Sequence, residues 1–394
     1  MAVASRRHAG KTLAVIGASE FQVPLILKAQ ELGCVVHAFA WECGDPGEEL
    51  ADVFHPVSTA EHEEVLRICQ EVGIDGACTI GSDFNNITAT WVANRMGLPA
   101  NTDECVRLST NKRAMRQAFA AAGDPSPKSI PVAEGESLPA ELEDLAYPVI
   151  VKPSDRSGSR GITKVLERCE LPGALAAAWH ESFCKVALVE EFLEGDEFSV
   201  ECLSWEGIHH VLQITRKYTT GAPRFIETAH LEPPLLTTDV AQRIERVVSR
   251  ALVTLGVKQG ASHAEVKVNG CGEPWIVEIG SRMGGDFIGS DLVQLSCGID
   301  YVGAVVDVAL GTKPNIDGFS SPRAAAVRFV LSQQDAEALE RLRSEHPELI
   351  VHGSWDVPHG HEVTDSSTRF GYCVMAAKTT DELVGWLPKG DVHG

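Results

Sequence analysis

The sequence predicts an α/β protein with a parallel, doubly wound N-terminal domain, an antiparallel region after it, and a small α+β unit at the C-terminus. Three observations carry this prediction. The length of 394 residues exceeds the usual size of one core. Over the first hundred residues β-rich runs alternate with helical patterns, which is typical of a parallel sheet. Beyond residue 170 strands follow one another through short turns, which indicates antiparallel pairing.

The N-terminal domain is expected to contain three strand–helix units. Ligands of such sheets bind beyond the carboxyl ends of the strands, so the turns 17–19 and 81–83 are placed on one rim. The fingerprint GxGxxG does not follow Gly17, so a nicotinamide-binding domain is not expected. The predicted strands are 12–19, 34–40 and 76–81, and the predicted helices are 24–33, 61–73 and 85–97.

A helix and a connecting region are predicted next. The pattern STNKRAMRQAFAAAG indicates a helix that Ser109 or Thr110 caps and Gly123 ends. Four prolines then mark a connection: Pro125, Pro127, Pro131 and Pro139.

The antiparallel region is expected to begin after a helix that follows Glu170. The segment 216–234, RKYTTGAPRFIETAHLEPP, is polar and turn-rich, so a loop that faces a bound ligand is expected there. The final seventy or so residues mix strands with one helix. Strands are predicted at 186–193, 197–207, 209–219 and twice within 260–285, with a helix at 240–256.

Composition excludes several classes of protein. The net charge of −21 and the pI of about 5.1 oppose a nucleic-acid partner. The longest apolar runs fall far short of the ~20 residues that span a bilayer, so no membrane span is predicted. The N-terminus lacks the apolar segment of a signal peptide, and the eleven cysteines form no CxxC pair. These features indicate a cytoplasmic protein with reduced cysteines in its core.

The stretch YPVIVKPSDRSGSRGITK, residues 147–164, combines an apolar run, Lys152 and a glycine-rich loop. Glycines let backbone N–H groups approach phosphate oxygens, and lysine and arginine supply charge. The stretch is not a Walker A loop, because Lys152 precedes the glycines. A phosphate-binding loop and a solvated hairpin turn both fit this segment.

Two glutamates lie in successive strands near residue 270. Glu265 in SHAEVKVNG and Glu278 in WIVEIGSRMGG flank a short turn, so they are expected to share one face of a strand pair. Two such carboxylates repel each other unless a cation lies between them, and Mg²⁺ prefers oxygen ligands. The alternative is that the glutamates face solvent or pair with Lys267 or Arg282.

The order of these elements resembles that of the ATP-grasp superfamily, which includes biotin carboxylase, D-alanine:D-alanine ligase, purine-pathway carboxylases and bacterial L-amino acid ligases. The resemblance covers about Asn101 to Asp300. It implies an ATP-grasp fold with a pre-ATP-grasp domain (1–110), a small lobe (111–187), a large lobe carrying the ATP, magnesium and substrate site (188–318), and a C-terminal α+β unit (319–394).

The resemblance implies nucleotide-binding roles for several residues. Lys112 and Lys152 would contact ATP phosphates, and Glu197 would accept hydrogen bonds from the ribose. The flexible loop over the phosphates would contain Ser157, Gly158, Ser159, Arg160 and Gly161, and the hinge that meets adenine through its backbone would contain Glu190, Glu191, Phe192 and Leu193.

The resemblance also implies a metal site and a catalytic arginine. Glu265 and Glu278 would bind magnesium, with manganese as a substitute. Many relatives have asparagine as a third ligand where this chain has Gly280, so Ser281 or water must complete the coordination. Arg282 would hold the transferring phosphoryl group or the tetrahedral intermediate; a salt bridge within the strand pair is the alternative.

Substrate contacts are expected around two further segments. An E-x-x-H segment like Glu227 and His230 lines the pocket of the L-amino acid ligases; the carboxylate would bind an α-ammonium group and the histidine would position an amine. Gly284 and Gly285 permit close approach of a substrate carboxylate. Asp286 would suit a basic substrate, because a buried carboxylate needs a cationic partner.

The implied activity is an ATP-dependent ligation of small-molecule carboxylate and amine substrates, chiefly amino acids. A carboxylate attacks the γ-phosphate, Lys152 and Arg282 stabilise charge, and an amine captures the acyl phosphate. The alternatives are a purine-pathway carboxylase or formyltransferase relative, and a nucleotide-binding regulator without turnover. Dimers are common in the superfamily, so a homodimer is compatible with the sequence.

Overall fold

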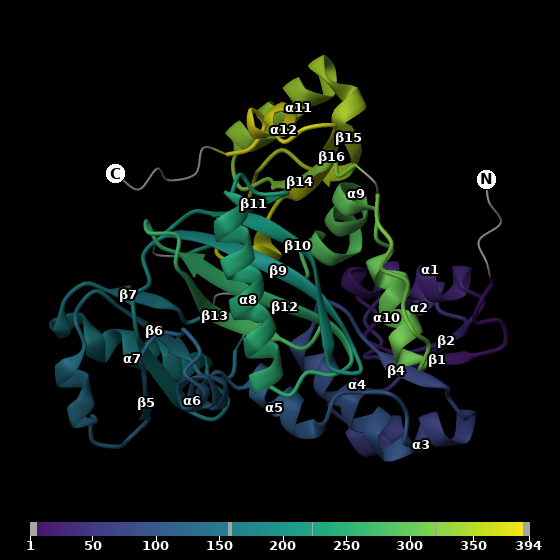
Figure 1. Ribbon diagram of the computed structural model, residues 1–394, viewed down its shortest axis with the longest axis horizontal. Helices are drawn as coiled ribbons and strands as arrows, with labels where there is room; N and C mark the ends of the chain where they lie inside the picture. Colours follow the sequence, from purple (N-terminus) through teal and green to yellow (C-terminus); the bar gives the residue numbers. More distant parts are fainter. Residues whose placement is uncertain (1–5, 157–159, 223, 320, 389–394) are drawn as a thin grey trace.

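The computed structural model describes residues 6–156, 160–222, 224–319 and 321–388. Its chain forms three sheets, of which one is parallel and two are antiparallel (Figure 1). The parallel sheet lies at the lower right of that view, a small four-stranded sheet lies at the lower left, and the C-terminal strands lie at the top. This arrangement confirms the predicted fold class.

The N-terminal sheet has the order β3-β2-β1-β4, with every strand parallel to its neighbour. Helices α1 and α10 cover one face, and α3 and α4 cover the other, so the sheet is doubly wound as predicted. The strands are β1 (Thr12–Ile16), β2 (Val35–Ala40), β3 (Val53–Pro56) and β4 (Gly76–Cys78), and the helices are α1 (Val23–Glu31), α2 (Pro46–Leu50), α3 (His62–Val72), α4 (Asp83–Met96) and α10 (Tyr301–Ala309).

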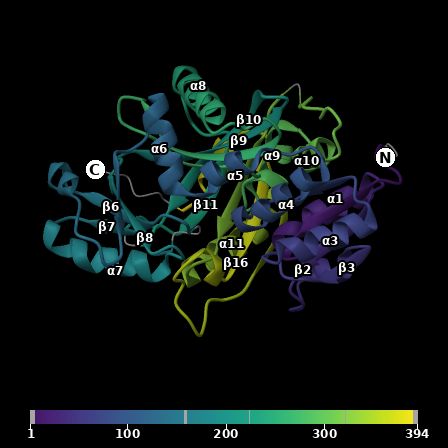
Figure 2. The same ribbon diagram turned by 90° about the horizontal axis from the view of Figure 1, so that it is seen from below.

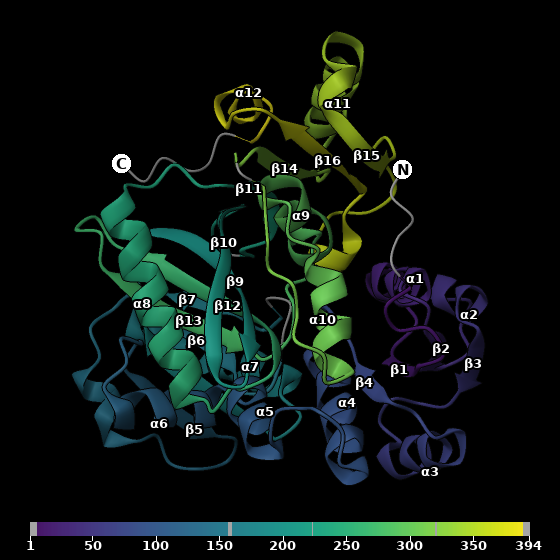
Figure 3. The same cartoon turned by 45° about the vertical axis from the view of Figure 1, so that its right-hand side comes forward.

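One of these helices, α10, comes from a much later part of the sequence than the N-terminal domain. Helix α10 stands between the large sheet and the N-terminal sheet (Figure 3). Its nine residues are all buried. The N-terminal sheet therefore shares its core with a segment that follows the predicted ATP site in sequence.

Helices α5 (Asp103–Thr110) and α6 (Lys112–Ala122) connect the N-terminal sheet to the small sheet (Figure 2). The predicted cap at Ser109 or Thr110 is wrong: the chain breaks at Asn111, whose side chain accepts the N–H of Ala114 and starts α6. The predicted end is confirmed, because Gly123 adopts φ +70°.

The small sheet has the order β5-β8-β6-β7 and is antiparallel throughout. The proline-marked connection is only partly a loop, since β5 forms within it and uses Pro131 as an edge-strand residue. Helix α7 (Leu171–Glu181) covers the sheet. The strands are β5 (Ser129–Ala133), β6 (Val149–Pro153), β7 (Thr163–Val165) and β8 (Val186–Glu191).

The large sheet has eight antiparallel strands in the order β13-β12-β9-β10-β11-β14-β16-β15. Helix α8 (Thr238–Thr254) packs on the half formed by β9, β10, β12 and β13. The segment 216–234 is not the loop that was predicted, because its beginning belongs to β10 and Glu227–Glu232 form β11. The strands are β9 (Asp196–Trp205), β10 (Ile208–Thr219), β11 (Glu227–Glu232), β12 (Gly260–Val268), β13 (Pro274–Gly280), β14 (Ala324–Phe329), β15 (Ile350–Trp355) and β16 (Gly371–Ala377).

The C-terminal unit is continuous with this sheet. Strand β14 pairs with β11 over four residue positions, so the unit extends the large sheet instead of forming a separate sheet. Its helices are α11 (Gln333–Glu345) and α12 (Asp381–Val384), and α9 (Val293–Cys297) packs beside it. The loop between β15 and β16 therefore joins two strands of the large sheet.

Two further findings concern the described residues. None of their helices is by itself long and apolar enough to cross a bilayer, although the bent pair Ile288–Cys297 and Tyr301–Ala309 passes that test by length and composition. Six of the eleven cysteines are buried, whereas Cys43, Cys169, Cys184 and Cys271 are exposed, so the prediction of core cysteines holds for only part of the set.

A buried acid at the end of β11 makes stability depend on pH. Glu232 is fully buried and is hydrogen-bonded by the hydroxyls of Thr215 (2.7 Å) and Ser296 (2.8 Å). Burial raises its pKa to about 8, so the folded chain holds a proton that the unfolded chain loses at lower pH. The stability that this proton contributes is complete below the ordinary glutamate pKa and is lost as the pH rises through 8.

The Glu232→Gln variant, which is neutral at every pH, is therefore expected to unfold at a higher temperature than the unaltered chain at pH 9, by about 2 °C or more. The two are expected to converge near pH 4. Thermal unfolding followed by circular dichroism at both pH values measures this difference. An equal difference at the two pH values would show that Glu232 does not titrate in this range.

Candidate functional site

One cavity collects most of the residues that the sequence singled out. It has a volume of about 200 Å³ and lies where the small sheet, the large sheet and the rim of the N-terminal sheet meet. The predicted residues that line it are Lys112, Lys152, Glu190, Glu191, Phe192, Leu193, Glu197, Glu227, Glu265, Glu278 and Arg282.

The two predicted phosphate-binding lysines lie close together and are buried. The Lys112 ammonium contacts the backbone oxygen of Arg156 at 2.7 Å and a carboxylate oxygen of Glu278 at 2.6 Å. The Lys152 ammonium lies 2.7 Å from Glu190, and burial lowers its pKa. Two cations held this way can exchange carboxylate for phosphate oxygens when a polyanion enters.

Glu190 is held by side-chain contacts that its predicted role, with the hinge meeting adenine mostly through backbone groups, did not include. Its carboxylate is buried between Lys152 and Arg116, whose guanidinium donates to both oxygens at 2.8 and 3.1 Å. Burial alone would raise its pKa, but Arg116 and Lys152 lower it to about 2. Glu190 therefore orients Lys152 through its side chain. Sequence analysis missed Arg116, which lies one helical turn after Lys112 on α6.

The rest of the hinge borders an apolar part of the cavity. Ile150, Ile162 and Val277 line this part together with Phe192. The ammonium of Lys267 donates to the backbone oxygen of Leu193 at 3.2 Å. Flat apolar walls beside a backbone segment suit a purine ring.

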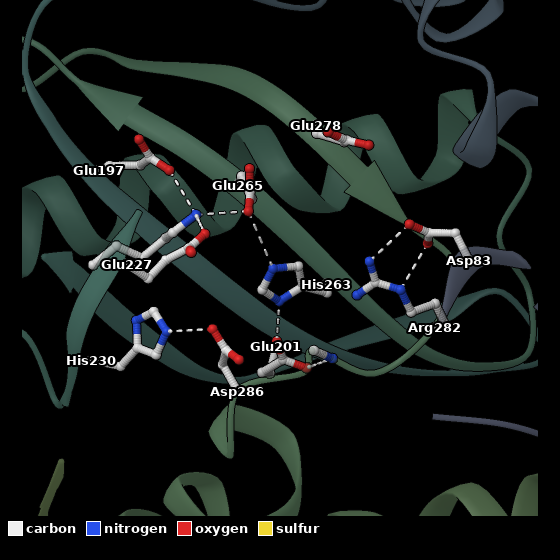
Figure 4. Close-up of polar contacts among 12 residues, drawn as sticks. Asp83, Glu197, Glu201, Glu227, His230, His263, Glu265, Glu278, Arg282 and Asp286 are labelled. Atoms are coloured by element: carbon white, nitrogen blue, oxygen red, sulfur yellow. Dashed lines mark hydrogen bonds and ion pairs between the residues drawn. The ribbon is translucent and has the colours of Figure 1, made fainter. Parts of the chain in front are cut away.

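Glu197, Glu265 and Glu227, the predicted ribose, metal and substrate carboxylates, lie around one space in Figure 4. Lys217 connects them. Its ammonium lies 2.7 Å from Glu197, 2.7 Å from Glu265 and 3.9 Å from Glu227. Burial alone would lower its pKa, but these three carboxylates raise it well above the ordinary lysine value. Sequence analysis missed Lys217; its signal was a lysine within an otherwise strand-like run.

The two predicted metal ligands face each other directly. Glu265 on β12 and Glu278 on β13 are paired in register on adjacent strands, and both line the cavity. Their cations are Lys217 and Lys112, and not Lys267 or Arg282. Within the described ranges, no group of three or more histidine, cysteine or acidic side chains forms a metal site. Two carboxylates beside phosphate-binding lysines nevertheless fit Mg²⁺, which commonly takes one or two carboxylates together with nucleotide phosphates.

Asp83 of the N-terminal domain lies beside Gly280, the position at which the resemblance led us to expect asparagine. Ser281 points away from the cavity, since its hydroxyl contacts Ser109 at 2.7 Å and Asn86 at 3.1 Å. A side chain at Gly280 would begin 3.0 Å from a carboxylate oxygen of Asp83. Asp83 accepts two hydrogen bonds from Arg282, at 2.7 and 3.0 Å, so the arginine fork is held in the cavity by a residue of α4.

Glu227 and His230 lie on strand β11, three positions apart. Residues at that spacing normally face opposite sides of a sheet. A bulge restores a common side, because Glu227 pairs with Thr219 and His230 pairs with Lys217. His230 is buried, and neither of its ring nitrogens has a hydrogen-bond partner, although Nε2 lies 3.8 Å from a carboxylate oxygen of Asp286 (Figure 4). Burial lowers the pKa of the ring, against the effect of Asp286.

The glycine pair separates two cavities. A side chain at Gly284 would overlap Glu201, whose carboxylate accepts the Gly284 N–H at 3.1 Å and forms a buried pair with His263. Gly285 has open space, bounded by Phe21 at 3.8 Å. Both glycines and Asp286 line a second cavity and not the first.

The predicted phosphate loop is only partly covered by the structure. Ser157, Gly158 and Ser159 lie outside the described residues. Gly161 has φ +67°, and a side chain there would begin 3.0 to 3.1 Å from Glu181 and Pro153, so this position requires glycine. Arg160 is exposed.

The match to a family model agrees with this geometry. Residues 145–291 match the model described as an ATP-grasp domain. The chain contains an ATP-grasp domain. The match spans the predicted loop, the predicted hinge, Glu265, Glu278 and Arg282, so it covers the central part of the first cavity.

Several proteins are similar to this chain. The alanine–anticapsin ligase of Bacillus subtilis is 25% identical over 312 residues, which cover 67% of this chain and 64% of the relative. Carnosine synthase 1 of Gallus gallus is 25% identical over 80% of this chain and 37% of its own length. The crystal structure of an L-amino acid ligase from Bacillus licheniformis superimposes with a TM-score of 0.80, covers 96% of each chain and is 24% identical. The chain thus spans about one to two thirds of the length of these curated relatives, and matches the solved structure as a fold.

Proposed function

We propose that this protein is an ATP-dependent carboxylate–amine ligase that joins amino acids through an acyl phosphate and releases ADP and phosphate. One observation carries the proposal. A single cavity is lined by two buried lysines, by two glutamates that are paired in register, and by an arginine whose guanidinium is hydrogen-bonded to Asp83. This is the set of charges that phosphoryl transfer to a carboxylate needs.

Nucleotide contacts are assigned to residues along the first cavity. The apolar wall and hinge accept the adenine, Glu197 accepts hydrogen bonds from the ribose, and Lys112 and Lys152 bind the phosphates. The cavity volume of about 200 Å³ is below that of typical cofactor sites, and ion pairs such as Lys112 with Glu278 lie within it. ATP binding is therefore expected to open these pairs.

Glu265 and Glu278 hold magnesium, or manganese, in this proposal. When bound, the ion neutralises phosphate charge and polarises the γ-phosphoryl group. When phosphate is absent, Lys112 balances Glu278 and Lys217 balances Glu265. When phosphate is present, Lys112 turns to the phosphate oxygens.

The reacting carboxylate is bound by Arg282, whose fork Asp83 orients. A carboxylate oxygen forms a bond to the γ-phosphorus while the bond to the bridging oxygen of ADP breaks. The amine nitrogen then attacks the acyl carbon. The bond between the acyl carbon and the phosphate oxygen breaks, and inorganic phosphate leaves with its electron pair. Arg282 stabilises negative charge in both steps because a planar guanidinium binds two oxygens at once.

Amino-acid substrates are supported by the site and by the relatives. One oxygen of Glu227 is occupied by Ser366 and Arg369, whereas the other lies 3.9 Å from Lys217 and has room for an α-ammonium group. One relative is named as a ligase of alanine.

The test measures ADP, AMP, inorganic phosphate and pyrophosphate with ATP, Mg²⁺ and amino acids offered singly and in pairs. ADP and phosphate are expected to appear with particular pairs, together with a product whose mass equals the two amino acids minus one water. AMP and pyrophosphate would contradict the acyl-phosphate route. Phosphate release that requires bicarbonate or formate would favour the carboxylase or formyltransferase alternative. ATP binding without turnover would favour a regulator.

A further inference from the structure

The second cavity lies beyond the glycine pair and is larger than the first. Its volume is about 820 Å³, and it is bounded by the N-terminal rim, the segment after Arg282 and the C-terminal unit. Asp286 and Phe287, which line it, both have positive φ angles, +51° and +65°. Strained backbone at consecutive residues other than glycine is typical of binding sites.

Part of the wall of this cavity is aromatic. Phe287 lies 4.1 Å from Tyr372 between ring centroids and 6.5 Å from Phe329, and Phe21 and Phe370 line the same space. Phe21 is half exposed on the N-terminal side. An apolar space of this size fits a large side chain of a small-molecule ligand.

Arg369 of the C-terminal unit joins the two cavities. Its guanidinium is buried, lies 3.8 Å above the ring of Phe329, and donates to Glu227 at 3.0 Å and to Asp286 at 2.9 Å. Glu227 borders the first cavity and Asp286 borders the second. One residue therefore neutralises carboxylates on both sides of the glycine pair, and it lowers the pKa of Asp286 against the effect of burial.

The other carboxylates of the second cavity are either paired with a neighbouring side chain or exposed to solvent. Asp291 contacts the ring of His352 at 2.8 Å and accepts from Ser290 at 2.5 Å, and Glu20 is exposed. The cationic partner that the sequence led us to expect for Asp286 is thus already present in the chain. A basic substrate is not required to satisfy it.

We propose that the second cavity binds the side chain of an amino-acid substrate that is aromatic or large and apolar, and that Arg369 is the residue that sets this specificity. Because Arg369 already pairs with Glu227 and Asp286, neither carboxylate requires a positively charged substrate side chain. The aromatic walls then select by apolar contact. This inference rests on the proposed ligase function for the identity of the ligand as an amino acid.

The test uses the full chain with Mg²⁺ and a non-hydrolysable ATP analogue. Calorimetric titration with L-phenylalanine, L-leucine, L-lysine and glycine measures binding without turnover. Phenylalanine is expected to bind at least about tenfold more tightly than lysine, which corresponds to about 1.4 kcal/mol. Equal or tighter binding of lysine would overturn the proposal.

Variants then identify the role of Arg369. In Arg369→Gln two carboxylates lose their cation, so the ratio of phenylalanine to lysine affinity is expected to fall at least about tenfold. Arg369→Lys is expected to retain most of the ratio, and the double variant Asp286→Asn with Arg369→Gln is expected to restore it in part, even if the single variant fails to fold. Arg341→Gln, an exposed arginine of the same unit, is the matched control.

The readouts separate this inference from the proposed function. A folded Arg369→Gln variant with an unchanged affinity ratio overturns the role of Arg369. Selective binding of phenylalanine without ADP formation from any pair would contradict the ligase function and leave the cavity assignment intact. ADP formation with pairs that lack a large side chain, at equal kcat/KM, would contradict the cavity assignment and leave the ligase function intact.

Discussion

The Glu278→Gln variant is expected to release phosphate from ATP about a thousandfold more slowly than the unaltered chain, which corresponds to about 4 kcal/mol of transition-state stabilisation. Two losses combine. Glu278 faces Glu265 in register as the proposed magnesium site, and it also holds the Lys112 ammonium at 2.6 Å. The amide keeps the shape of the side chain and removes its charge.

The measurement is the initial rate of phosphate release against Mg²⁺ concentration, with the amino-acid pair that the unaltered chain uses. Glu273→Gln is the matched control, because Glu273 lies on the turn of the same hairpin and is exposed. The Glu273 variant is expected to keep its rate. A rate for Glu278→Gln within threefold of the unaltered chain, at every Mg²⁺ concentration, would remove Glu278 from the site.

The Arg282→Lys variant is expected to lose about a hundredfold in kcat while ATP affinity changes by less than about threefold. Lysine preserves the charge but cannot form the two hydrogen bonds that Arg282 makes to Asp83 or a bidentate contact to a carboxylate. The effect therefore falls on the reacting carboxylate and not on the nucleotide.

Single-turnover phosphate release and binding of the ATP analogue separate these two effects. Arg243→Lys, an exchange at an arginine of α8 that is remote from the cavity, is the control. If the Arg282 variant lost ATP affinity and kept its single-turnover rate, Arg282 would be a nucleotide-binding residue.

Part of the site could be predicted from the sequence because the signals for it are local. Glu265 and Glu278 flank a short turn, and a hairpin brings such positions face to face. Lys152 lies near the end of β6, and the hinge residues lie at and just after the end of β8. Helix α10 was not predicted, and strand β14 was expected only as part of a C-terminal unit that mixes strands with one helix. The sequence did not reveal the partners of either element, because pairing with a distant segment leaves no periodic signal.

The remaining site residues depend on contacts between distant parts of the chain. Asp83 and Arg282 lie 199 positions apart, and Arg369 reaches Glu227 across 142 positions. Lys217 meets three carboxylates only because β9, β10, β11 and β12 are neighbours in one sheet. Glu227 and His230 share a side only through a bulge that their spacing does not reveal.

The sequence by itself determined the α/β architecture, the ATP-grasp order of lysines, loop, hinge and glutamates, and the presence of Arg282. These follow from local periodicity, turns and spacing, which act over a few residues. Only the tertiary structure decided which cation meets which carboxylate, where Ser281 points, and that the C-terminal unit reaches the site through Arg369. Ion pairing depends on distance in space, and strand order in the large sheet sets that distance.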